Sequence, residues 1–201
     1  MRDGAVVSFQ SFYDVIVFPG RERTEFKGGG ERMVQANDGE NAWYYDGAAD
    51  MIREQSEAQI ANFDRAVRGS LDTLLRGDWR GRAELTFLER RPATLGKRND
   101  VLKLTYEDGF AVEFEIADDG TPIKAIRRSV NDAGEESVDE DRYAQFVEFS
   151  GIRVPMIVDR FTNRVHMSRI NYQSVEFNKT VPDSLFAKPA TVKELKRSFE
   201  L

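Results

Sequence analysis

Alternation of apolar and polar residues with a period of two dominates the chain and predicts β-strands. Between residues 5 and 18, apolar side chains fall on one face of an extended segment, at Val7, Phe9, Tyr13, Val15 and Val17. Turn sequences at 28–30 and 37–39 join this segment to its neighbours. The pattern predicts about eleven strands in total. Besides the segment at 5–18, the predicted strands cover residues 21–27, 31–36, 41–45, 82–90, 100–106, 110–117, 123–130, 142–149, 154–162 and 165–178.

A change of period between residues 50 and 76 predicts two consecutive helices. Its apolar residues are mostly spaced by three, four or eight, which is typical of one helical stripe: Met51, Ile52, Ile60, Phe63, Val67, Leu71, Leu74 and Leu75. Gly69 and Ser70 fit the end of one helix and the cap of the next. The pairs Arg53–Glu57 and Asp64–Arg68 are expected on the outer surface. We place this helical block at residues 49–76. A short turn and a charged helix are also expected at residues 184–201.

For the predicted hairpin of strands 100–106 and 110–117, the sequence also predicts the pairing register. With a two-residue turn, Leu104 would lie opposite Glu113, which would put a carboxylate on the apolar face. A three-residue loop at 107–109 instead places Leu104 opposite Val112 and Leu102 opposite Phe114. The other face then carries Lys103, Glu113 and Glu115. A sheet that is apolar on one side and polar on the other is antiparallel.

These elements predict a mainly β fold with some helix, built on a curved antiparallel sheet. Two arrangements remain open. In one, a closed barrel or two-sheet sandwich is filled by its own side chains. In the other, helices lie across the mouth of the curved sheet and leave a hydrophobic cavity for a ligand.

The amino-acid composition excludes several kinds of partner and of catalytic or metal site. The chain has 201 residues and a formal net charge of −6, which fits one domain covering residues 1–201 and argues against a nucleic-acid partner. Cysteine is absent and His166 is the single histidine, so thiolate chemistry and multi-histidine metal sites are excluded. No apolar run is long enough for a transmembrane helix.

The remaining candidate sites favour ordinary structural roles. Strand patterns flank the glycines at 28–30 on both sides, which indicates a hairpin turn and not a phosphate loop. The acidic stretch at 131–141 lacks the calcium-loop pattern and is expected to be a solvated loop. His166 has no nucleophile motif beside it. We therefore predict no catalytic residue, metal or cofactor, although a pair of carboxylates acting on a glycoside stays open.

The order of several landmarks resembles the LolA-like superfamily of periplasmic lipoprotein carriers. The landmarks span roughly residues 15 to 190 and flank the helical block: FPGRER at 18–23, DGENAWYY at 38–45, DGTP at 119–122, GIRVP at 151–155 and VPDSLFAKP at 181–189. The resemblance implies an unclosed barrel of about eleven antiparallel strands with a helical lid over a lipid-binding hollow. It also implies a periplasmic location, with the signal peptide absent from the chain as given.

On this interpretation the protein is not an enzyme and carries a lipid or an acylated lipoprotein, with transient membrane contact. The cavity wall is expected to include Trp43, Leu102, Leu104, Val112 and Phe114, and the inner face of the lid to carry Ile60, Phe63 and Val67. The family's carrier tethers its lid through a barrel arginine, for which Arg21, Arg23 and Arg53 are candidates. The alternative is an envelope sensor or interaction domain on the same scaffold that binds a peptide or a lipid without transporting it; an envelope protein could then be a partner.

Overall fold

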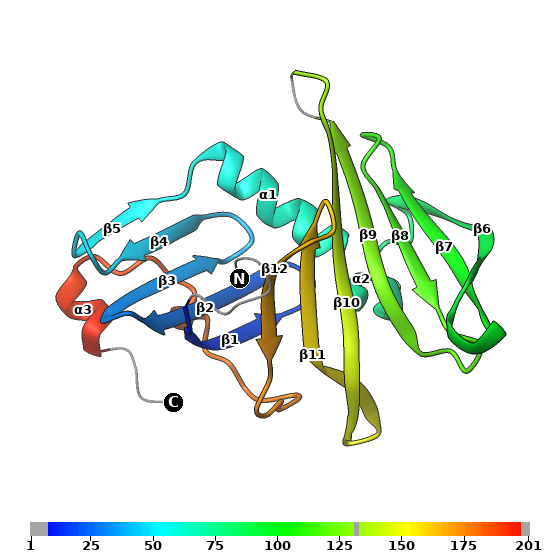
Figure 1. Cartoon of the computed structure of the whole chain (residues 1–201). Coiled ribbons are helices and arrows are strands. Elements are labelled where there is room, and N and C mark those ends of the chain that lie inside the picture. The colour runs from blue at the N-terminus through cyan, green and yellow to red at the C-terminus, as the bar shows by residue number, and fades with distance from the viewer. Residues whose placement is uncertain (1–7, 131–132, 198–201) are drawn as a thin grey trace. The chain divides into compact units, whose positions relative to one another are not determined.

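A computed structural model describes residues 8–130 and 133–197, and these divide into two compact units. Of the described residues, the first unit holds 8–67 and 179–197, and the second holds the rest. Figure 1 shows the elements of both. Each unit is built on one open antiparallel sheet, which confirms the predicted mainly β fold with few helices.

The first sheet is a meander of five strands in chain order. Positive φ angles at Gly29 and Gly30 form the tight turn expected between its second and third strands. The strands are β1 (Ser11–Val17), β2 (Arg21–Gly28), β3 (Glu31–Asn37), β4 (Ala42–Asp46) and β5 (Met51–Glu54).

The core of the first unit is covered by the end of the chain. The short helix α3 (Val192–Arg197) places Leu195 against the apolar face of β3 and β4, in a cluster with Val34, Ala36, Trp43 and Tyr45. A 3-10 turn at Asp183–Leu185 precedes it. The predicted turn and helix after residue 184 are thus confirmed as far as residue 197; residues 198–201 lie outside the described part.

The helical block is shorter than predicted. Met51 and Ile52 belong to β5, which pairs with β4, and helix α1 begins only at Glu57 and ends at Arg68. An apolar pair fits either period, and pairing with β4 decides for the strand. Helix α2 (Leu71–Arg76) follows; Ser70 caps it as expected, accepting a hydrogen bond from the Thr73 backbone N–H. Of the helices described, none has the length and hydropathy to cross a bilayer.

The second sheet has seven strands, also joined in chain order. The predicted three-residue loop is confirmed, because Leu102 pairs with Phe114 and Leu104 with Val112, while Gly109 adopts a positive φ. The strands are β6 (Ala83–Pro92), β7 (Arg98–Tyr106), β8 (Ala111–Ile116), β9 (Pro122–Val130), β10 (Glu136–Phe149), β11 (Ile152–Thr162) and β12 (Val165–Asn171). A 3-10 turn at Thr94–Gly96 joins β6 to β7.

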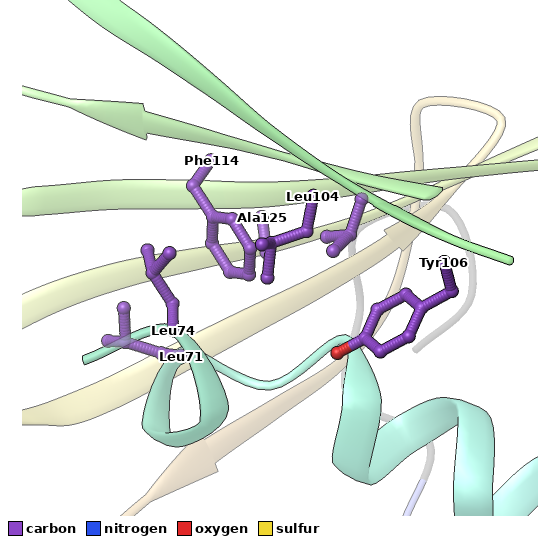
Figure 2. Packing of buried hydrophobic residues seen from close by; sticks show 7 residues of the cluster. Leu71, Leu74, Leu104, Tyr106, Phe114 and Ala125 are labelled. Atoms are coloured by element: carbon purple, nitrogen blue, oxygen red, sulfur yellow. The ribbon is translucent and has the colours of Figure 1, made fainter. Parts of the chain in front are cut away.

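Helix α2 covers one face of the second sheet, which we call the helix-covered face. Leu71 and Leu74 point from α2 onto side chains of β7, β8 and β9 (Figure 2). This cluster also contains Leu104, Tyr106, Val112, Phe114 and Ala125. Its packing holds the short helix in place, since six residues are too few for a stable isolated helix.

The opposite, charged face of the second sheet differs from expectation. The sequence places Glu115 on the polar face of the sheet, yet this residue is only 4% exposed. Arg91, Asn99 and Lys124 from three neighbouring strands converge on its carboxylate at 3.4, 3.4 and 3.1 Å. Alternation places Glu115 correctly on this face, but the burial comes from long side chains that meet above it.

Three predicted boundaries are wrong or lie outside the described residues. The acidic stretch is not a loop throughout, because β10 begins at Glu136 and pairs with β9; residues 131 and 132 are not described. The last predicted strand ends at Asn171 instead of 178. The first begins at Ser11, and residues 1–7 lie outside the description.

Candidate functional site

Four of the five predicted wall residues lie together on the helix-covered face. Leu104, Val112 and Phe114 are 0% exposed and contact the leucines of α2, whereas Leu102 is half-buried. The confirmed register places all four on one side. In this structure the three buried side chains form a packed cluster beneath α2 (Figure 2). Their role in lining a ligand cavity stays a prediction.

The apolar surface of this face extends past the helix. Phe87 on β6 pairs with Leu102, which pairs with Phe114. Along this row exposure rises from 0% at Phe114, through half-burial at Leu102, to 60% at Phe87. A large aromatic side chain therefore lies open to solvent beside the packed cluster.

The fifth predicted wall residue, Trp43, belongs to the first unit. It is 1% exposed, and its indole Nε1–H donates to the carbonyl oxygen of Phe186 at 2.8 Å. The segment that buries it comes from the end of the chain. Trp43 therefore lies in the core of its own unit, in a cluster separate from that of Leu104 and Phe114.

The predicted lid residues lie on α1, which has no buried side chain. Ile60 is 40% exposed, and Phe63 and Val67 are half-buried. The stripe predicted from their spacing is present. The role of these residues as a lid stays a prediction.

Arg68, the last residue of α1, makes the contacts that sequence reasoning missed. Its guanidinium donates to the Asp108 carboxylate at 2.8 Å and lies 4.9 Å from the ring centroids of both Tyr106 and Phe110. The Tyr106 hydroxyl donates to the Arg68 carbonyl oxygen at 2.9 Å. The expectation that Arg68 lies on the outer surface is therefore wrong: the β7–β8 hairpin fixes the point where the chain enters the second unit.

Two of the three arginines considered as lid tethers hold the end of the chain instead. Arg21 binds Asp183 at 2.6 Å, and buried Arg23 donates to the carbonyl oxygen of Leu185 at 2.7 Å. Burial lowers the pKa of Arg23 to about 10, so the side chain stays charged at neutral pH. The third, Arg53, is exposed on β5.

Several titratable groups of the second sheet form ion pairs. On the charged face, Glu113 binds Arg91 at 2.7 Å, and Arg91 also contacts Glu115. His166 stacks on Phe161 with ring centroids 4.7 Å apart, and its Nε2 lies 2.8 Å from Asp159. Within the described residues, no group of three or more possible metal ligands is found. These charged side chains thus have partners of opposite charge within the fold.

Comparison with known proteins adds one structural similarity. No protein-family model matches the chain, and no curated protein matches it significantly. A crystal structure described as a "putative outer membrane lipoprotein-sorting protein domain" from Vibrio parahaemolyticus is 10% identical, with 85% of this chain and 80% of that chain covered and a TM-score of 0.48.

Proposed function

We propose that this protein binds and carries a lipid, or the acyl chain of a lipoprotein, in the periplasm without catalysing a reaction. The proposal extends to residues 1–201 acting as one LolA-like domain, in keeping with the order of landmarks along the sequence. It also assigns α1 the role of a lid, with Ile60, Phe63 and Val67 on its inner face, and gives the carrier only transient contact with membranes.

The observation that carries the proposal is the graded exposure of the row Phe114, Leu102 and Phe87. This apolar face continues without a polar break from Phe114 through Leu102 to an aromatic ring that is 60% exposed. An acyl chain laid along the row would remove that surface from water and extend the existing cluster.

The energetic need for such a carrier follows from the chain length of common lipids. Each buried methylene is worth about 0.8 kcal/mol, so a sixteen-carbon chain gains on the order of 12 kcal/mol by leaving water. A lipid therefore does not cross an aqueous compartment unaided. A lid whose closed state competes with the ligand would keep binding reversible.

Phe87 is the residue to test, because Phe114 is too well packed. Removing the Phe114 ring is expected to cost roughly 3–5 kcal/mol and to unfold much of the protein. Phe87→Ser removes a side chain that is already mostly in water, so we expect the denaturant midpoint to change little. Binding of a fluorescent fatty-acyl probe should weaken severalfold.

The matched control is Leu95→Ser, which removes an apolar side chain that is 99% exposed and away from the row. It should leave both the midpoint and probe binding unchanged. Failure of the wild type to bind the probe would contradict carriage. Recovery of a stable protein partner in place of a lipid would instead support the alternative, an envelope sensor.

A further inference from the structure

The charged face of the second sheet contains a groove that the proposed function does not use. Its volume is about 460 Å³, within the range of small-molecule sites. Three elements contribute two residues each: Ile126 and Arg128 from β9, Val138 and Glu140 from β10, and Asn163 and Arg164 from the turn between β11 and β12. Because Ile126 pairs with Glu113 and not with Phe114, the groove lies opposite the helix-covered face.

The floor of the groove is apolar. Ile126 is only 5% exposed and Val138 is half-buried. Arg128 pairs with Val138 across β9 and β10, so its guanidinium rises beside this floor. A short apolar group fits such a surface without entering the core.

The charge at the rim is positive. The Glu140 carboxylate already accepts two hydrogen bonds from Arg142, at 2.7 and 2.9 Å. Arg128 is 3.8 Å from Glu113, whose closer partner is Arg91 at 2.7 Å. Arg164 has no ion-pair partner within the described residues. Arg164 is therefore available to an anion, and Arg128 has only its single long contact with Glu113 to exchange for one.

Arg164 occupies a backbone position that favours glycine. Thr162 pairs with Val165, so Asn163 and Arg164 form a two-residue turn, with φ angles of 50° and 69°. Turns of this kind need positive φ at both central residues. Two other two-residue hairpin turns of this protein have glycine at the second position, Gly30 and Gly151.

The turn is also held firmly against the groove. The Asn163 backbone N–H donates to the Val138 carbonyl oxygen at 2.8 Å, and the Val138 N–H donates to Asn163 Oδ1 at 2.9 Å. A strained arginine kept at a fixed place is the kind of outlier from which a functional hypothesis can be drawn.

We propose that this groove binds a small organic anion. Its carboxylate or phosphate head pairs with Arg128 and Arg164, and its short apolar body lies on Ile126 and Val138. Guanidinium groups recognise both heads through paired hydrogen bonds. The site is independent of acyl-chain carriage, because it lies on the other face of the sheet.

The test is calorimetric titration of the full chain with hexanoate, hexyl phosphate and hexanol. We expect one or both anions to bind and hexanol to bind at least tenfold more weakly. In the R164G variant, affinity for the anion should fall at least fivefold while the thermal midpoint rises, because glycine relieves the turn. Arg128→Gln should also weaken anion binding. If R164G does not fold, the affinity of Arg128→Gln tests the proposal in its place.

Ser150→Gly is the matched control, since it relaxes the corresponding turn of the β10–β11 hairpin without removing a charge. It should leave anion affinity unchanged. The proposal is overturned if neither anion binds at millimolar concentration, if hexanol binds as well as they do, or if folded R164G and Arg128→Gln both keep wild-type affinity. Phe87→Ser should leave anion affinity unchanged. The anion-binding proposal and the acyl-chain proposal can therefore fail independently.

Discussion

Gly47 is a residue whose importance only the three-dimensional structure reveals. It follows β4, where the chain passes so close to β3 that an added Cβ would fall on the backbone carbonyl group of Arg32. Since backbone atoms cannot move aside as a flexible side chain can, Gly47→Ala should lower the free energy of unfolding by about 1–3 kcal/mol or more.

Urea denaturation measures this change. Gly20→Ala is the control, because nothing lies within 4 Å of the Cβ it would add, and its midpoint should stay near that of the wild type. Equal midpoints for the two variants would show that the close approach of Gly47 to β3 is not maintained in solution.

Individual residues of the candidate site were predictable to different degrees. Leu104, Val112 and Phe114 could be assigned to one face because alternation and turn length fix the register. Alternation reports the face a side chain occupies but not what lies opposite it, so it could not decide between a filled core and a hollow. Arg68 could not be found, since its partner Asp108 is 40 positions away along the sequence.

At the scale of elements, we expect the stability of the β7–β8 hairpin to depend on pH through Asp108. The Phe110 backbone N–H and the Arg68 guanidinium donate hydrogen bonds that lower the pKa of this carboxyl group. A carboxyl whose pKa is lower in the folded state stabilises the fold when ionised. This stabilisation is present above the ordinary aspartate pKa, roughly 4, and is lost as the pH falls through the lower folded-state value.

We therefore expect D108N to have a lower thermal midpoint than the wild type at pH 7, with a difference that shrinks as the pH falls below about 4. Thermal denaturation across this pH range measures the effect. Glu107→Gln, at the adjacent position, has no ion-pair partner within the described residues and should show no such dependence. A difference in thermal midpoint between D108N and the wild type that is the same at every pH would contradict the role of the Asp108 charge.

Elements with two agreeing signals were predicted well, and elements with one ambiguous signal were not. The β7–β8 register follows from apolar pairing together with a loop that needs Gly109. Helix α2 follows from its stripe together with the cap at Ser70. By contrast, Met51 and Ile52 are adjacent apolar residues that suit a helix or a strand, and only the neighbouring β4 selects the strand.

At the scale of the whole molecule, two tryptophans report on the two units. Trp43 is buried in the first and Trp79 is half-buried in the second. Leu195→Ala removes a fully buried side chain from the first unit and should cost roughly 2–5 kcal/mol. If residues 1–201 act as one cooperative domain, as proposed, the unfolding transitions of both tryptophans should shift together.

Fluorescence-monitored denaturation of Trp43→Phe and Trp79→Phe backgrounds, each with and without Leu195→Ala, measures the two transitions separately. Lys193→Ala is the matched control on the exposed side of α3 and should shift neither. A shift confined to the Trp43 signal would mean that the units unfold independently and that the single-domain proposal fails.

The sequence does not predict that the chain returns to the first unit after the second sheet. The sequence predicts a turn and a helix after residue 184, but not that Leu185, Phe186 and Leu195 are buried in the unit that contains Trp43. Local periodicity carries no information about a partner that lies 143 positions away. The two compact units were not predicted for the same reason.

The burial of Trp43 by the end of the chain bears on the order in which the protein is made. The first sheet leaves the ribosome early, yet its covering segment around Phe186 is synthesised 143 residues after Trp43. At typical rates of translation this leaves the apolar face of β3 and β4 uncovered for on the order of ten seconds. The second sheet, whose strands follow one another, needs no such wait. Of the two units, the one whose sheet is translated earlier is thus completed later, and a nascent chain at this stage presents a hydrophobic surface suited to a chaperone.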